Sequence, residues 1–337
     1  MKAAFLLTFL IGMVLATGAQ SPSRIETVPL PQAQNFALPA IGASALQQAS
    51  VWQAETQSNP ANANAWLNYA VWTQRNTALT SEQKQIQLTQ ISDQAQKYIS
   101  GSGEWQLIRF LQSNKTDSAA ITLALEKITD KIQVYPFAIQ SAIIRQNKTE
   151  LKNYCTAYAK ILAPNVDLSY SSYHGNVLRS APDSAVIAAM GENDLVPMAI
   201  QQQVNGIRPD VRLVYYQPSV ALQYKKLFLC LTLGENILSA YRQNASFRGL
   251  LLDVSGEKNT ANPEELFIPT VHMNYMKMGV FTGALAQLHN NYLPSLILAY
   301  RYYKKINSET AERYKELIEK IAREGGKENV ISAALNK

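Results

Sequence analysis

Acidic and amide side chains gather in one short segment, Gly191-Glu192-Asn193-Asp194, directly after an apolar run at residues 185–190. A carboxylate pair such as Glu192 and Asp194 can act as a general acid and base, or can ligate a cation. The alternatives are a solvated turn residue for Glu192 and a helix N-cap for Asp194, of which the cap is favoured. The segment is therefore a candidate ligand-binding loop.

The elements around this loop form a predicted βαβ unit. The apolar run at 185–190 is typical of a strand covered on both faces, because its apolar residues are consecutive. A helix at 195–205 follows, with Pro197 in its first turn and Gly206 in the left-handed position just past its end. A second strand, at 210–216, completes the unit. Open parallel sheets bind ligands at the carboxyl ends of their strands, which is where the loop lies.

Two further polar groups belong to this unit. Gln202 falls inside the apolar arc of the helix, so we expect it to find a polar partner. Arg208 and Asp210 flank Pro209, and we expect them to pair and fix the turn, with an anion contact by Arg208 as the alternative.

The chain then continues with a predicted helix at 219–243 and a predicted strand at 247–254. If all strands are parallel, Asp253 reaches the same carboxyl edge as Glu192 and Asp194. The candidate ligand-binding residues are Gly191, Glu192, Asn193, Asp194, Gln202, Arg208 and Asp253.

The βαβ segment resembles a signature in the extracytoplasmic soluble part of protein O-mannosyltransferase-like membrane proteins, carried by Gly191-Glu192-Asn193-Asp194, Pro197, Gln202 and Gly206-Ile207-Arg208-Pro209-Asp210-Val211-Arg212. Glu192 stands where Asp is usual in that family, and Leu195-Val196 replaces a Thr-aromatic pair. The membrane part that carries glycosyl transfer there is absent. The resemblance thus implies a soluble module of the bacterial cell envelope, often found with helical repeats, and does not imply transferase activity.

The N-terminus has the features of an export signal. Lys2 precedes an apolar run at residues 3–16, and small residues up to Ala19 provide a cleavage site before Gln20. We expect a cleaved signal peptide at 1–19, with an uncleaved anchor as the alternative, and a Pro-rich linker at 20–43. No later segment has the length of a transmembrane helix, so we expect a periplasmic or otherwise extracytoplasmic protein with no transmembrane segment in the mature chain.

Residues 44–180 are predicted to form a helical region. Amphipathic segments begin at about 44, 81, 117 and 148 in alternation, a spacing close to tetratricopeptide-type helix pairs, with a plain helical bundle as the alternative. Helix start signals stand at Asn59-Pro60, at Thr80 with Gln83 as a capping box, and at Asp117. The fold class is therefore α+α/β: a tetratricopeptide-like helical region followed by a small α/β module at 181–337, built on a parallel βαβ unit, with C-terminal helices.

Several kinds of chemistry are not expected. The net charge of +6 is scattered, which disfavours nucleic acid as a partner. His174, His272 and His289 lack metal-ligand spacing, and the sequence has no glycine-rich cofactor loop, so no metal and no cofactor are expected. Cys155 and Cys230 are predicted either to pair in the exported protein or to be buried thiols.

Two hypotheses about function follow. The favoured one is a non-catalytic binding or scaffold protein, accessory to envelope glycan or glycoprotein assembly. Its helical repeats would hold a protein partner, and its α/β module would bind a glycan or small polar ligand, or only pack. The alternative is a glycan-acting hydrolase or transferase that uses Glu192, Asp194 and Asp253.

Overall fold

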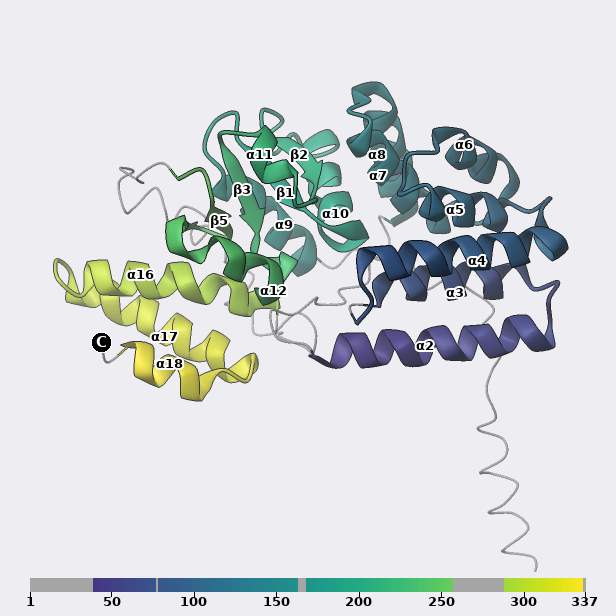
Figure 1. Ribbon diagram of the computed structural model, residues 1–337. Helices are drawn as coiled ribbons and strands as arrows, with labels where there is room; N and C mark the ends of the chain where they lie inside the picture. The colour runs from purple at the N-terminus through teal and green to yellow at the C-terminus, as the bar shows by residue number, and fades with distance from the viewer. Residues whose placement is uncertain (1–38, 77, 163–167, 257–287, 336–337) are drawn as a thin grey trace, which may run out of the picture. The chain divides into compact units, whose positions relative to one another are not determined.

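The computed structural model describes residues 39–76, 78–162, 168–256 and 288–335 (Figure 1). The predicted signal peptide, most of the predicted linker, and His272 lie outside these residues. The described residues form two compact units, one at Pro39–Thr129 and the other within Asp130–Lys337. Each unit has its own hydrophobic core.

The first unit is helical throughout its described residues. Its helices are α2 (Pro39–Ser58), α3 (Ala63–Arg75), α4 (Ser81–Ile99), α5 (Gly103–Gln112) and α6 (Ser118–Lys127). The start of α2 at Pro39 corrects the predicted linker, which extended to residue 43. Proline is compatible with the first turn of a helix, because the N–H that it lacks would have no partner there.

The helix starts predicted at Thr80 with Gln83 and at Asp117 are confirmed, whereas α3 is capped by Asn62 and not by the predicted Asn59. Asn62 caps α3, and Asp117 caps α6 by accepting a hydrogen bond from the Ala120 N–H at 3.1 Å. Thr80 and Gln83 form a complete capping box at the start of α4. Local sequence therefore determines where these helices begin.

Helix α3 packs against α2, α4 and α5, and α5 packs against α6. Trp52 of α2 and Trp66 of α3 are almost completely buried, which is the packing role expected for aromatic residues at helical spacing. Helices α4 and α6 begin within a residue of the predicted repeat positions, whereas α8 (Lys148–Leu162) belongs to the second unit. The likeness to tetratricopeptide repeats stays a prediction.

The change from helices to a mixed α/β arrangement occurs close to residue 180, as predicted. No strand precedes Val186 among the described residues. Three helices before that point, α7 (Tyr135–Ile144), α8 and α9 (Leu168–Ser180), nevertheless belong to the compact unit that contains the sheet. Helix α10 contacts all three of them.

The second unit is organised around a five-stranded mixed sheet with strand order β2-β1-β3-β5-β4. Its strands are β1 (Val186–Ala189), β2 (Arg212–Tyr215), β3 (Leu227–Cys230), β4 (Ser246–Arg248) and β5 (Leu251–Asp253). The parallel pairing of β1 with β2 confirms the predicted βαβ unit, and β3 also runs parallel to β1. Strands β5 and β4 are antiparallel additions.

Two parts of this sheet correct the sequence analysis. The predicted helix at 219–243 is interrupted by β3, whose four residues are all buried. A short, continuous apolar run fits a buried strand as well as a helix, so periodicity alone does not separate them. The predicted strand at 247–254 is divided into β4 and β5, which form an antiparallel pair around Gly249 and Leu250.

Both faces of the sheet are covered. Ile187 and Phe228 face a core shared with α7–α10 and the C-terminal helices, whereas Ala188 and Leu229 face a smaller core shared with α11 (Val220–Gln223) and α12 (Glu235–Leu238). Alternate residues of each strand thus serve opposite cores, as the two-residue period of a strand requires.

The remaining helices precede the sheet in sequence, connect its strands or follow it. They are α10 (Gly191–Gln203), the 3-10 turns η1 (Lys131–Gln133), η2 (Leu231–Leu233), η3 (Ser239–Asn244) and η5 (Asn290–Tyr292), and the C-terminal α16 (Leu293–Tyr303), α17 (Ser308–Glu324) and α18 (Glu328–Leu335). In the part of the chain that the structure describes, no helix has both the length and the apolar character needed to cross a bilayer.

Candidate functional site

The predicted loop Gly191-Glu192-Asn193-Asp194 forms the first turn of α10. Gly191 has a φ of +71°, a left-handed conformation that glycine adopts without strain, and this lets the helix start directly after β1. The segment lies at the carboxyl end of the central parallel strand, as expected. The side chain of Glu192 lies outside the described residues, so its predicted role stays untested.

The prediction that Asp194 caps the helix is wrong. Helix α10 begins three residues before Asp194, and Met190 occupies the N-cap position without a side-chain hydrogen bond. Pro197 is consequently inside the helix and not in its first turn. The chain can turn into the helix earlier than expected because Gly191, and not Asp194, forms the junction.

Asp194 instead points into the protein, with 4% of its surface exposed. Its Oδ2 accepts a hydrogen bond from the Thr232 hydroxyl at 2.8 Å. The Nε2 atom of His174, itself 1% exposed, lies 3.7 Å from Oδ1. Three sequence-distant elements, α9, α10 and η2, thus bring an imidazole, a carboxylate and a hydroxyl together in the interior.

This buried polar cluster continues towards the C-terminal helices. The ring of Tyr173 packs edge-on against those of His174 and Tyr292, at centroid distances of 5.2 and 5.7 Å. The Tyr173 hydroxyl accepts a hydrogen bond from the Asn291 amide at 2.8 Å, and the Tyr292 hydroxyl accepts one from Asn176 at 2.9 Å. Burial raises the pKa of Tyr173 well above its usual range, so the phenol stays protonated.

Cys230, at the carboxyl end of β3, is buried close to the same cluster. Burial, and then the negative charge of Asp194, raise the pKa of its thiol well above the usual value. Burial also raises the pKa of Cys155, to about 12. Both cysteines are free, which resolves the two sequence-based alternatives in favour of buried thiols. Neither has the thiolate character that a nucleophilic cysteine requires.

The predicted pairing of Arg208 with Asp210 is confirmed. The Arg208 guanidinium donates two hydrogen bonds to the Asp210 carboxylate, at 2.8 and 2.7 Å, and also donates to the carbonyl oxygens of Ala181 and Pro182. The hydrogen bonds from Arg208 lower the pKa of Asp210 far below its ordinary value. Arg208 therefore fixes the turn before β2, and its guanidinium is engaged within the protein.

Gln202 also has the polar partners that we expected. Its side-chain amide donates to the carbonyl oxygens of Arg208 and Val211, each at 2.8 Å. Gly206 has a φ of +67°, the left-handed conformation predicted for the end of this helix. Gln202 and Gly206 therefore position the connection from α10 to β2.

Asp253 does not join the other candidates, which corrects the predicted three-carboxylate edge. Strand β5 runs antiparallel to β3, and Asp253 pairs with Phe228, near the amino end of β3. Its carboxylate accepts hydrogen bonds from the Ser255 N–H and hydroxyl at 3.0 and 2.7 Å. Because Asp194 follows the opposite end of the parallel strands, the two carboxylates cannot act on one reacting atom.

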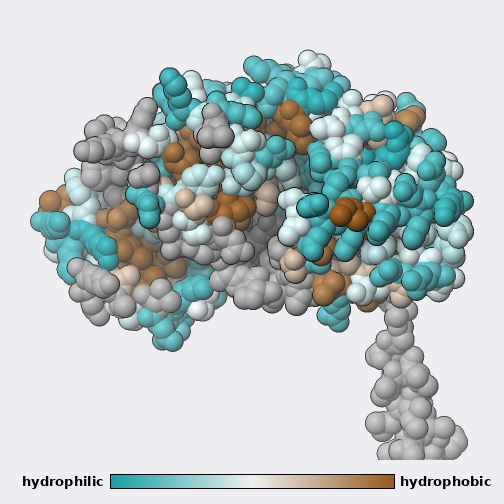
Figure 2. Space-filling model, viewed as in Figure 1, coloured by the Kyte–Doolittle hydropathy of each residue, from teal (hydrophilic) through white to brown (hydrophobic). Residues whose placement is uncertain are grey.

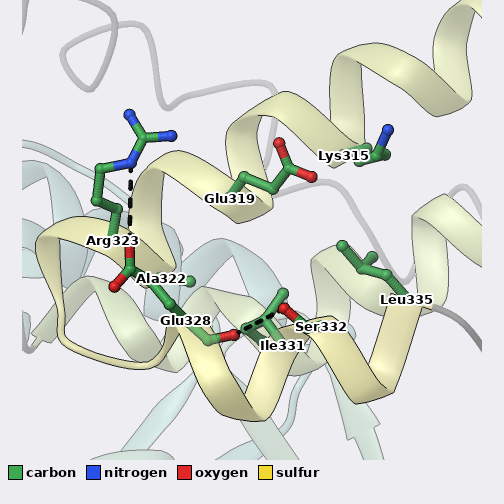
Figure 3. Close-up of a pocket in the computed structure, with 8 residues that line it drawn as sticks. All are labelled: Lys315, Glu319, Ala322, Arg323, Glu328, Ile331, Ser332 and Leu335. Carbon is green, nitrogen blue, oxygen red and sulfur yellow. Dashed lines mark hydrogen bonds and ion pairs between the residues drawn. The ribbon is translucent and has the colours of Figure 1, made fainter.

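A second candidate site is a hollow of about 320 Å³ between α17 and α18. Figure 3 draws the residues that line it. Its apolar side chains are Ala322, Ile331 and Leu335. The remaining lining residues are Lys315, Glu319, Arg323, Glu328 and Ser332. No motif in the sequence predicts this hollow, although the strongly amphipathic pattern of α17 is visible in it.

The charged rim of this hollow is open to solvent. Arg323 and Glu328 approach to 4.0 Å, and their side chains are more than half exposed, so the pair contributes little to stability. In Figure 3 the Arg323 guanidinium and the Lys315 ammonium point away from α18. The hollow could accept an apolar group, but it offers no buried polar group that would select a particular ligand.

Among the described residues, no group of three or more histidine, cysteine or acidic side chains is arranged to hold a metal ion. Comparison of the chain with protein-family models, with curated proteins and with solved structures finds no match. The geometry of the two units is therefore the basis for any statement about function.

Proposed function

We propose that this chain is an exported cell-envelope protein that acts as a non-catalytic binding or scaffold protein. Its helical unit holds a protein partner, and its α/β unit binds a small polar or glycan-like ligand or serves only to pack. The process that it serves is envelope glycan or glycoprotein assembly, in keeping with the resemblance of residues 191–212 to a soluble envelope module. The likeness of the helical unit to tetratricopeptide repeats is part of this proposal.

The observation that carries the proposal is a set of exposed apolar side chains on the first unit. Leu46 and Val51 of α2 and Ile86 of α4 are 55%, 42% and 53% exposed. Figure 2 shows hydrophobic patches over α2 and α4 on the same face of this unit. Helices α2 and α4 are the first members of successive helix pairs, and stacked helix pairs commonly bind partners on the surface that such helices form.

Tyr98 adds an aromatic group to the exposed side of α4. It is 58% exposed, and its ring stacks on that of Trp66 with a centroid distance of 6.3 Å and an interplanar angle of 12°. A rigid, partly exposed tyrosine is a frequent contact residue at protein interfaces, because it combines a large apolar ring with a hydroxyl.

The positions of the carboxylates in the α/β unit favour a role in binding or packing over a role in catalysis. The two described carboxylates of the predicted catalytic set, Asp194 and Asp253, lie towards opposite ends of the parallel strands. Each accepts a hydrogen bond from a neighbouring side chain, Asp194 from Thr232 and Asp253 from Ser255. Both carboxylates therefore make hydrogen bonds that stabilise the fold.

Site-specific photo-crosslinking in intact cells tests the proposal. A photoreactive amino acid replaces Leu46 or Ile86, and Val204 serves as the matched control, because it is an exposed apolar residue of the second unit. We expect an adduct to the same protein from positions 46 and 86 and not from 204. Ile86→Asp should abolish the adduct at position 46, while Val204→Asp should not. Equal adducts at all three positions, or none at 46 and 86, would contradict the proposal.

Export is tested separately. We expect the mature protein to begin at Gln20 and to be recovered from the extracytoplasmic fraction. N-terminal sequencing of the purified protein measures this. A cytoplasmic chain with Met1 intact would exclude an envelope role, whatever partner the helical unit binds.

A further inference from the structure

The turn that joins α16 to α17 places an apolar and basic sequence, Lys304-Lys305-Ile306, on the surface. Ile306 is 61% exposed, the largest exposed fraction among the large hydrophobic side chains of the described residues. Lys304 and Lys305 are exposed beside it. Because Ile306 lies outside the core, the stability of the unit does not require an apolar residue at this position.

The backbone of the turn stays hydrogen-bonded to the last turn of α16. The Lys304 N–H donates to the Tyr300 carbonyl at 2.8 Å, and the Asn307 N–H donates to the Tyr303 carbonyl at 2.7 Å. At Lys305 and Ile306 the backbone tightens, because their N–H groups donate to the carbonyls three residues back, those of Tyr302 and Tyr303, at 3.2 and 3.0 Å. Leu298, which is 38% exposed, and the half-buried Tyr302 lie one helical turn apart on α16 and form an apolar stripe, and Ile306 follows it in the turn.

The charge around this stripe is positive. Five basic and two acidic residues lie between positions 301 and 315. Both acidic residues pair within α17, Glu309 with Arg313 at 2.6 Å and Glu312 with Lys315 at 2.8 Å. In the described part of the chain, no carboxylate forms an ion pair with Lys304 or Lys305. Lys304 lies over the ring of Tyr300, 5.4 Å from its centroid.

We propose that this turn is a docking surface for a membrane that contains anionic lipids. The ammonium groups of Lys304 and Lys305 attract anionic headgroups. The ring of Tyr302 can lie at headgroup level, and the exposed Ile306 can enter the boundary with the acyl chains. The turn forms one end of the α16–α17 hairpin in Figure 1, and Figure 2 shows a hydrophobic patch beside hydrophilic side chains there. The contact is peripheral and reversible, because only one large side chain inserts.

Vesicle flotation tests this proposal with the mature chain, which lacks residues 1–19. The probes are vesicles of phosphatidylcholine alone and of phosphatidylcholine with 30% phosphatidylglycerol. We expect binding to the anionic vesicles only, and weaker binding when NaCl is raised from about 50 to about 500 mM. Binding that is equal for both vesicles, or absent from both, would overturn the proposal.

Substitutions then locate the contact. Lys304→Gln with Lys305→Gln should lower the partition coefficient about thirtyfold, and Ile306→Ser should lower it about tenfold. The matched control is Lys225→Gln with Lys226→Gln, which removes the same charge from two adjacent exposed lysines elsewhere in the unit. If this control loses as much binding as the Lys304 and Lys305 variant, the attraction is non-specific and the proposed surface is wrong. Because these tests need no protein partner, their failure would leave the proposed function standing.

Discussion

In the first unit, Asn62, Thr80 and Asp117 each accept a hydrogen bond from a backbone N–H three residues further along the chain. In the second unit, Asp194 accepts a hydrogen bond from Thr232, thirty-eight residues away. The first kind of bond lies at helix ends within reach of water, whereas the second lies in the interior. A buried group that loses its hydrogen-bond partner cannot bond to water instead. Removing a side-chain acceptor should therefore lower the free energy of unfolding more in the second unit than in the first.

The largest expected effect is that of Asp194→Ala. It leaves the buried Thr232 hydroxyl without its acceptor and removes the carboxylate beside His174, so we expect the free energy of unfolding of the second unit to fall by about 3 kcal/mol. Urea titration followed by hydrogen exchange in peptides of the sheet measures this. Asp93→Ala, at an exposed position of α4, is the control and should change little. A loss of only about 1 kcal/mol would be the size expected of a cap and would contradict the buried pairing.

Arg208→Ala should have the next largest effect. The guanidinium joins Asp210 to the carbonyl oxygens of Ala181 and Pro182, and it is only 22% exposed. We expect a loss of about 2 kcal/mol, measured by the same titration. Arg208→Lys should recover only part of it, because an ammonium cannot reproduce the forked geometry. Full recovery by lysine would show that charge alone matters at this turn.

The same turn predicts a pH dependence. The pKa of Asp210 is lowered in the folded state, so its pairing contributes fully well above the ordinary aspartate value of about 3.9. The contribution is lost as the pH falls below that value towards the lower folded pKa. Wild-type stability should therefore fall more steeply than that of Asp210→Asn between about pH 5 and pH 2. If the stability of the two proteins changed equally with pH, the lowered pKa of Asp210 would be contradicted.

Thr80→Ala should have a smaller effect, confined to the first unit. Loss of the capping box removes one side-chain acceptor at a solvated helix end, with a cost of about 1 kcal/mol. All four tryptophans, Trp52, Trp66, Trp72 and Trp105, lie in this unit, so tryptophan fluorescence in urea reports its unfolding. Thr80→Ser is the control and should retain the cap. If Asp194→Ala shifted the fluorescence transition as much as Thr80→Ala, the two units would not unfold independently.

The smallest expected effect is that of Glu309→Gln, which breaks an exposed pair with Arg313 on α17. Exposed pairs four residues apart contribute about 0.3 kcal/mol, so thermal unfolding should be almost unchanged. This variant lies in the same unit as Asp194. A loss as large as that of Asp194→Ala would mean that location in this unit, and not burial, determines the cost of removing a carboxylate.

The predictions from sequence that are confirmed rest on local signals. The cap at Asp117, the capping box at Thr80 and the left-handed Gly206 each depend on a few adjacent residues. The parallel βαβ unit could be predicted because its two strands and its helix are adjacent in sequence. Arg208 and Asp210 are two residues apart, so their pairing was also visible.

The features that were missed depend on residues far apart in the chain. Nothing near Asp194 in the sequence indicates His174 or Thr232, so a cap was the simplest interpretation of a carboxylate after a glycine. The position of Asp253 depends on the direction of β5, which a strand of three residues does not reveal in the sequence. Strand β3 was predicted as helix because its consecutive apolar residues suit either structure.

The bonds between α9 and the C-terminal part of the chain have a consequence for the order of events during synthesis. Tyr173 and Asn176 find their partners at Asn291 and Tyr292, more than a hundred residues later. Chains fold more slowly when native contacts join distant residues, because a long loop must close before the contact forms. The helices of the first unit can pair as soon as they have been synthesised, because they contact close neighbours in the chain. In the second unit all described strands have emerged once Asp253 is made, but the bonds from α9 cannot form until residue 292 has emerged.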